Sequence, residues 1–178
     1  MDIFEQKKCL DSMSVLIDTR EQETDRSRKR YKLIGLPCDR AVLDYGDYTY
    51  QFTDPDGKLH FDTSKRIAPE VAIERKMSLA ELAQCYTHDR DRFRAEFERA
   101  AETGSKIYLL LENSNFENLC NGRYRSKFNP NAYLASVFAY LARYNCQLIM
   151  CKADTSGRLI REILYRELKE RLERGEFG

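Results

Sequence analysis

The chain has 178 residues, of which 42% are hydrophobic and 33% are charged, a balance that indicates one globular domain able to bury a sizeable core. Its formal net charge is +1, so any affinity for nucleic acid has to come from local basic patches and bound cations, because the global field is weak. No apolar run reaches membrane-spanning length, residues 1–14 lack the pattern of a secretory signal peptide, and the six cysteines are not spaced like a zinc site or a disulfide framework, so we expect a reduced cytoplasmic protein.

The first third of the chain predicts a helix and a hairpin between short strands. We expect residues 1–13 to form a flexible terminus and the β-branched run 14–17 to form a buried strand that delivers Asp18 at its end. A basic helix follows over residues 23–34, closed by Gly35 and Pro37, and a strand over 40–43. Alternating aromatic residues over 46–53, a turn at 54–57 and residues 58–61 predict the hairpin.

The middle of the chain predicts one strand that serves both a core and a site. In an extended segment over residues 70–76, Glu74 and Lys76 point to one face while Val71 and Ile73 point to the other. A helix should then run from about residue 78 to Gly104, with Ser78 and Glu81 as a capping box and Met77 and Leu82 as a hydrophobic staple.

The remaining chain alternates between strands and helices. Residues 107–111 and 147–151 predict strands, residues 130–144 predict a helix opened by Asn129 and Pro130, and residues 113–131 contain the longest candidate loop. Residues 155–178 carry a C-terminal amphipathic helix. This alternation after residue 70 implies right-handed parallel crossovers, so we predict a single α/β domain over residues 1–178 with a mixed central β-sheet flanked by helices.

Two carboxylates and one lysine stand out as candidate catalytic groups. Pairing of the strand that follows Gly46 with the strand over 70–76 would bring Asp47 and Glu74 around one magnesium ion, with Lys76 beside them to orient or polarise a water. The simpler interpretation is a turn aspartate and an exposed Glu74–Lys76 ion pair, which is common in charged proteins. The ordered set as a whole favours metal-assisted phosphodiester cleavage.

The sequence also resembles a known family through three motifs in order, at residues 18–21 (DTRE), 46–48 (GDY) and 74–76 (ERK). Together these resemble the XPF-type nuclease family over residues 15–151. The resemblance implies a restriction-endonuclease-like core and cleavage of branched, flap or fork DNA with Mg²⁺ or Mn²⁺, in repair, recombination or mobile-element processing. By the same resemblance Asp47 and Glu74 are metal ligands and Lys76 is a catalytic lysine. Asp18 and Arg75 complete the site, and Arg75 is expected to pair with a carboxylate or the phosphate, because a guanidinium stays protonated.

The chain departs from the family pattern at two places. Ala80 stands where the family motif has its final aspartate, and no helix-hairpin-helix module follows the domain. Ala80 therefore keeps a second hypothesis open, a catalytically silent protein that binds DNA or acts as a scaffold. A third is a ribonuclease or a restriction-type enzyme on the same core, because a fold does not determine the substrate.

DNA is the expected partner, and its contacts are expected from basic side chains around the site. We predict Arg20 and the loop residues Arg123, Tyr124, Arg125 and Lys127, where basic and aromatic residues alternate. For the basic cluster over residues 26–32, a solvated helix face is an equally good interpretation. Family members often pair through this domain, which keeps a homodimer open beside a monomer, and the small size points to a bacterial, archaeal or phage source.

Overall fold

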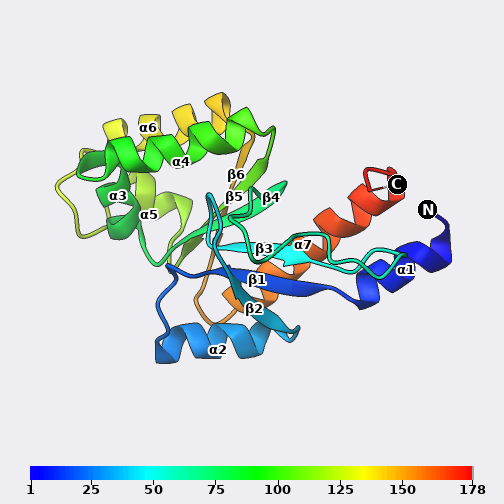
Figure 1. Cartoon of the computed structure of the whole chain (residues 1–178). Coiled ribbons are helices and arrows are strands. Elements are labelled where there is room, and N and C mark those ends of the chain that lie inside the picture. The colour runs from blue at the N-terminus through cyan, green and yellow to red at the C-terminus, as the bar shows by residue number, and fades with distance from the viewer. Residues whose placement is uncertain (178) are drawn as a thin grey trace.

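A computed structural model describes residues 1–177 and shows, within them, a six-stranded mixed sheet with helices on both faces (Figure 1). The strands are β1 (Ser14–Asp18), β2 (Cys38–Ala41), β3 (Tyr48–Gln51), β4 (Val71–Lys76), β5 (Lys106–Glu112) and β6 (Cys146–Cys151). The helices are α1 (Ile3–Asp11), α2 (Asp25–Ile34), α3 (Leu79–Thr87), α4 (Arg90–Glu102), α5 (Phe116–Cys120), α6 (Pro130–Arg143) and α7 (Ser156–Glu173). No helix within residues 1–177 has the length and apolar character needed to cross a membrane.

The sheet order is β2-β1-β3-β4-β5-β6. Strand β3 runs antiparallel to both of its neighbours, with Tyr48 opposite Ile73 of β4, whereas β1 and β2 are parallel and so are β4, β5 and β6. The predicted mixed α/β sheet is therefore confirmed. The reversal at β3 matters for the site, because it places the chain entering β3 beside the carboxyl ends of β1 and β4.

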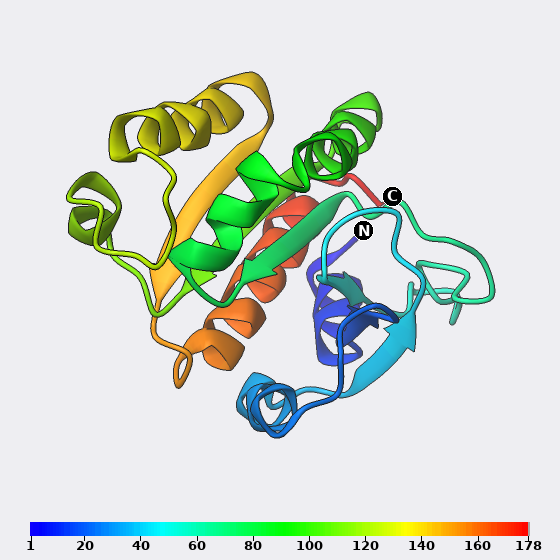
Figure 2. The ribbon, with the colours of Figure 1, turned by 90° about the vertical axis from the view of Figure 1, so that its left-hand side faces the viewer.

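Helices cover the two faces of the sheet and form separate cores. Helices α3, α4 and α6 pack on one face over Ala72 and Leu109, and α1, α2 and α7 pack on the other over Val71 and Ile73. Figure 2, turned by 90° from Figure 1, shows the sheet between these two layers and the two termini close together. Val71 and Ile73 therefore face one core, as the sequence predicts, while Ala72, on the opposite face of β4, packs into a second core that was not predicted.

Local chemistry specifies several helix ends. Thr24 caps α2 with a capping box to Ser27, and Gly35 ends that helix in the left-handed region at φ 66°. The Asn129 side chain accepts from the amides of Asn131 and Ala132, and Pro130 opens α6. These ends agree with the sequence predictions within two residues.

Four local predictions need correction. Residues 3–11 form helix α1, capped by a reciprocal Asp2–Glu5 box, where we expected a flexible terminus. The second hairpin strand is reduced to one bridge between Thr53 and Leu59. Short helix α5 lies inside the expected loop, started by the side chain of Asn115. The starts of α1 and α5 depend on capping side chains, Asp2 with Glu5 and Asn115, which are weak signals in the sequence.

The fourth correction concerns the helix expected over residues 78–104, which breaks at His88–Asp89 into α3 and α4. The break lets Phe93 of α4 pack edge-on against Tyr86 of α3, with ring centroids 5.5 Å apart. The expected capping box is also shifted: Ser78 Oγ accepts from the Glu81 amide, but the Glu81 carboxylate accepts from the Met77 amide at 2.6 Å. Met77 is 41% exposed, so it does not form a buried staple.

Candidate active site

Asp47, Glu74 and Lys76 meet where the chain enters β3 beside the end of β4. The Asp47 amide donates to the Ile73 carbonyl at 2.8 Å, and Asp47 Oδ2 accepts from the Arg75 amide at 2.7 Å. Gly46 permits this close approach, because it has a φ of 76° and a Cβ there would lie 2.7 Å from Ala72 Cβ. The convergence predicted from strand pairing is therefore present.

The Lys76 ammonium forms a close ion pair with Glu74. Its Nζ lies 2.5 Å from Glu74 Oε1, with both side chains largely buried, and 5.5 Å from the centroid of the Phe93 ring. Burial lowers the pKa of Lys76, but the charges of Glu74 and Asp47 raise it by more, so the net pKa lies above its usual range. In this arrangement the Lys76 ammonium donates to the Glu74 carboxylate.

Negative charge accumulates around this pair. Burial and the charge of Glu74 raise the pKa of Asp47 well above its ordinary value, although Lys76 opposes the shift. The pKa of Glu96 on α4 is also raised, first by burial and then by Glu74. A bound cation would offset this repulsion between carboxylates.

The carboxylate oxygens in this cluster fit a hard divalent cation such as Mg²⁺ or Mn²⁺. Within residues 1–177, Asp47 Oδ1 and Glu74 Oε2 have no hydrogen-bond partner. Within residues 1–177 there is no group of three or more Asp, Glu, His or Cys side chains placed to bind a metal ion. Mg²⁺ is often bound by only one or two carboxylates and keeps several waters, so Asp47 and Glu74 are a sufficient protein donor set.

Asp18 lies behind this cluster. It is fully buried, its Oδ1 accepts from the Arg20 amide and Nε at 2.7 Å, and its Oδ2 accepts from the Leu43 amide at 2.8 Å. Both oxygens are thus occupied within the protein. Asp18 fixes Arg20, whose half-exposed side chain reaches Glu96 at 3.4 Å.

Arg75 belongs to a buried ionic network under the site, which we call the Arg30–Arg75 network. Arg75 contacts Glu21 and Glu112, each at 3.2 Å, and Arg30 contacts the same two carboxylates, each at 3.1 Å. The Tyr48 hydroxyl donates to Glu21 at 3.0 Å. Arg75 therefore pairs with carboxylates, one of the two roles expected from its sequence.

Sequence reasoning missed Glu96 and Glu112, and it placed Arg30 in a basic cluster expected either to contact phosphate or to face solvent, whereas Arg30 is buried and paired with Glu21 and Glu112. One signal was available for Glu112, because it ends the apolar run of β5 just as Asp18 ends that of β1. Arg30 and Glu96 lie on charged helix faces, where no local pattern separates an inward side chain from a solvated one.

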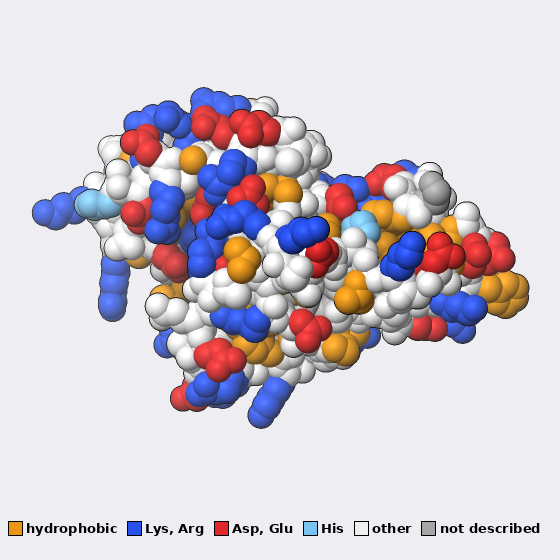
Figure 3. All heavy atoms as spheres, viewed as in Figure 1, with side chains coloured by type: hydrophobic (Ala, Val, Ile, Leu, Met, Phe, Trp, Pro, Cys, Tyr) orange, Lys and Arg blue, Asp and Glu red, His pale blue; other side chains and the backbone are white. Residues whose placement is uncertain are grey.

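These groups line a cleft of about 1500 Å³ between α2 and the α3–α4 layer. The acidic side chains Asp47, Glu74 and Glu96 line one part of this cleft, beside Lys76. Basic side chains stand around it, namely Arg20, Arg26, Lys29 and Arg92. Figure 3 shows lysine and arginine side chains gathered between the upper helical layer and the lower part of the molecule. A basic rim around an acidic centre suits a phosphate backbone and a cation together.

The other residues singled out in the sequence lie outside the cleft lining. Ala80 is partly buried in the first turn of α3. Arg123, Arg125 and Lys127 are exposed on the loop before α6. Tyr124 is held within that loop, since its hydroxyl donates to the Phe128 carbonyl at 2.8 Å and its ring packs edge-on against Tyr133.

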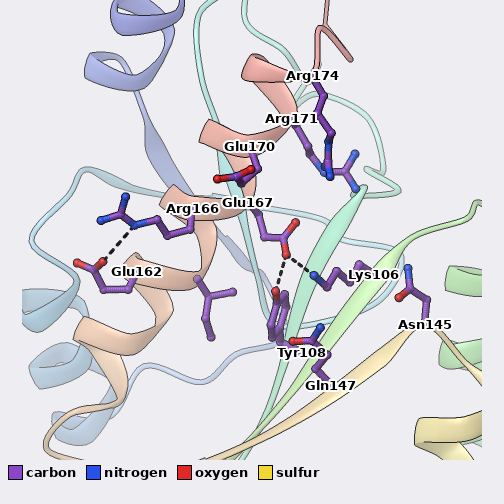
Figure 4. A pocket seen from close by; sticks show the side chains of 11 residues that line it. Lys106, Tyr108, Asn145, Gln147, Glu162, Arg166, Glu167, Glu170, Arg171 and Arg174 are labelled. Carbon is purple, nitrogen blue, oxygen red and sulfur yellow. Dashed lines mark hydrogen bonds and ion pairs between the residues drawn. The ribbon is translucent and has the colours of Figure 1, made fainter.

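A second cavity, of about 640 Å³, lies between α7 and the starts of β5 and β6. Figure 4 shows Lys106 and Tyr108 pointing toward the Glu167 carboxylate, which both contact. The lining includes glutamates and arginines of α7 and its C-terminal cap, and the residues of the three motifs do not contribute to it.

Comparisons with known proteins bear on the family and the fold of this chain. A family model described as the ERCC4 domain matches residues 17–163. Among solved structures, XPF from Aeropyrum pernix is similar with a TM-score of 0.58 and 18% identity, covering 86% of this chain and 60% of that chain. XPF from Aeropyrum pernix in complex with DNA is similar with a TM-score of 0.58 and 20% identity, covering 88% and 64%. This chain thus spans less than two thirds of either one. A comparison with curated proteins finds no match.

Proposed function

Because this chain belongs to the ERCC4 domain family, we propose that it is a divalent-metal-dependent endonuclease that hydrolyses DNA phosphodiester bonds at branched, flap or fork structures. The observation that carries the proposal is the meeting of Asp47, Glu74 and Lys76 in one cleft with a basic rim. The fold match to an XPF structure described as a complex with DNA supports DNA as the substrate class.

In this proposal Asp47 and Glu74 would hold Mg²⁺ or Mn²⁺ through their unpaired oxygens. When bound, the cation would neutralise part of the phosphate charge and would make a bound water easier to ionise. The Lys76 ammonium, held by Glu74 at 2.5 Å, donates to the attacking water or to the phosphate oxygen on which charge develops. Attack of water at phosphorus forms a new P–O bond and breaks the bond from phosphorus to the 3′ oxygen; the water releases a proton to solvent and the 3′ oxygen takes one up, which leaves a 5′-phosphate and a 3′-hydroxyl, as the family resemblance implies.

The other residues of the site orient these groups and bind the substrate. Asp18 holds Arg20, and the Arg30–Arg75 network holds the end of β4, so the reacting side chains stand on a rigid strand. Arg26, Lys29 and Arg92 are placed to contact phosphates along the cleft. The exposed Arg123, Arg125 and Lys127 are proposed as contacts to DNA beyond it.

The biological setting and assembly belong to the same proposal. Action on branched DNA fits a role in repair, recombination or mobile-element processing. Strand β6 ends the sheet with partly exposed Leu148 and Met150, which offers a surface for pairing two copies. Light scattering over a concentration series tests the dimer.

Ala80 favours a second candidate function, a DNA-binding protein without turnover. An aspartate in the first turn of α3 would add negative charge near the helix start and the proposed cation, and alanine supplies none. The fold and the basic rim would still bind DNA in that case. The two candidates differ only in turnover.

The deciding experiment compares cleavage of labelled flap, fork, plain duplex and RNA substrates with Mg²⁺, Mn²⁺ or chelator. The variants are Asp47→Asn, Glu74→Gln, Lys76→Met and Ala80→Asp, and Glu98→Gln on the exposed face of α4 is the matched control. Metal-dependent cutting of branched DNA that is lost in the first three variants and kept in the control supports the endonuclease. DNA binding without cutting by the wild type or by Ala80→Asp supports the silent protein, and preferred cutting of RNA overturns the DNA assignment.

A further inference from the structure

Glu96 is an acidic side chain of the cleft that no family motif includes. Its side chain is 14% exposed, and it lines the same cleft as Asp47 and Glu74. The sequence places it there because Phe93 and Phe97, which are 3% and 1% exposed, anchor α4 in the core. The neighbouring position Glu96 is then turned toward the cleft.

The other acidic side chains that line the cleft near this cluster are engaged elsewhere. Glu21 and Glu112 are neutralised by Arg30 and Arg75, and one oxygen of Glu81, in the first turn of α3, accepts from the Met77 amide at 2.6 Å. Glu96 has a looser partner, Arg20, whose Nη1 lies 3.4 Å from Oε1. Within residues 1–177 the second oxygen of Glu96 has no hydrogen-bond partner. Glu96 therefore keeps an acceptor available in the cleft.

A cation held by two carboxylates needs acceptors for its remaining waters. Mg²⁺ keeps several waters, each of which donates hydrogen bonds outward, and groups that accept these bonds tune the affinity of the site. In the family motif an acidic residue stands in the first turn of α3, where this chain has Ala80. Helix α4 supplies the carboxylate of Glu96 to the cleft.

We propose that Glu96 is a positioning residue of the cation site, which accepts hydrogen bonds from waters on the divalent ion held by Asp47 and Glu74. This inference rests on the proposed function. Arg20 holds the Glu96 carboxylate from behind, and Asp18 in turn holds Arg20, so the first motif is linked to the cation through α4. The motif strand and the charged helix thus act as one support.

The test measures Mn²⁺ binding alone, by isothermal titration or by electron paramagnetic resonance, with no nucleic acid present. Glu96→Gln is expected to weaken Mn²⁺ affinity by about 10- to 100-fold, the range for groups that support metal ligands. Glu96→Asp keeps the charge and is expected to bind more tightly than Glu96→Gln. Glu98→Gln, whose 53% exposed side chain contacts Arg94, is expected to bind like the wild type.

Thermal unfolding in chelator shows whether each variant is folded, so loss of binding is separated from loss of structure. The inference is overturned if the wild type binds Mn²⁺, Asp47→Asn abolishes binding, and Glu96→Gln binds as the wild type does. That outcome leaves the proposed nuclease site intact. If the wild type binds no Mn²⁺, both this inference and the metal dependence of the proposed function are wrong.

Discussion

Replacing Glu112 by glutamine removes one of the two carboxylates that neutralise Arg30 and Arg75 beneath the cleft. Glu112 is 1% exposed and accepts from Arg30 at 3.1 Å and from Arg75 at 3.2 Å. Glutamine keeps the size of the side chain and removes its charge. After the change, Glu21 alone faces two guanidinium groups, whose side chains are 5% and 14% exposed.

The size of the effect follows from this burial. Breaking a buried ion pair by removing one partner costs about 3–5 kcal/mol, because the remaining charge is left without compensation. Glu21 still compensates part of the charge here, so we expect about 3 kcal/mol of lost unfolding free energy, at the lower end of that range. For a domain of this size, such a loss lowers the melting temperature by roughly 10 °C.

Urea denaturation at pH 7 measures this change through the transition midpoint, with the slope checked for two-state behaviour. The matched control is Asp25→Asn, which removes an exposed partner of Arg28 at 2.6 Å and should change stability by less than about 0.5 kcal/mol. A Glu112→Gln variant that unfolds within about 1 kcal/mol of the wild type would show that this network does not support the end of β4.

Three further predictions concern charge and packing. In chelator, Asp47→Asn should be more stable than the wild type at pH 8, and this difference in unfolding free energy should narrow toward pH 4, because the raised pKa of Asp47 in the folded state makes wild-type stability fall as pH rises. Denaturation at both pH values measures the difference, and a difference that widens toward low pH contradicts the prediction. Gly157→Ala should lower the unfolding free energy by about 1–3 kcal/mol despite the better helix propensity of alanine, because the new Cβ would lie 2.3 Å from the Arg30 carbonyl oxygen where α7 crosses α2. Urea unfolding measures this change, and an unchanged transition midpoint refutes the prediction. Burial raises the pKa of Glu167, but hydrogen bonds from Lys106 and Tyr108 lower it below its ordinary value, so the contribution of Glu167 to stability is present at neutral pH and lost as pH falls. Glu167→Gln should therefore lower the melting temperature at pH 7 and narrow the difference in melting temperature between pH 7 and pH 4, and an unaltered pH profile counts against this prediction.

The most predictable features of the fold were those that depend only on residues next to one another in the chain. The strand over residues 71–76 and its two-faced pattern follow from the two-residue period of extended backbone, which needs no knowledge of distant contacts. Helix α6 starts as predicted because Asn129 and Pro130 act on adjacent amides. The helix break at His88 was not predictable in this way, because it depends on how Phe93 meets Tyr86 across two helices.

The same distinction between local patterns and distant contacts applies to the candidate site. Its three central residues were named from their motifs, and strand pairing was enough to expect Asp47 beside Glu74. Arg30, Glu96 and Glu112 could not be assigned, because a charged side chain on a helix or at a strand end has the same local pattern whether it meets solvent or a partner far along the chain. The loop tyrosine Tyr124 shows the reverse case, since its hydroxyl donates within its own loop and its ring packs against Tyr133 of α6.

The order of residues by itself determined the alternation of strands and helices, the family, and the identity of the acidic and basic groups near the cleft. Only the tertiary structure decided which of those groups are neutralised and which keep an unpaired oxygen in the cleft. The physical reason is that charge interactions depend on distance and burial, and both are set by elements far apart in the chain, such as β4, α2 and α4.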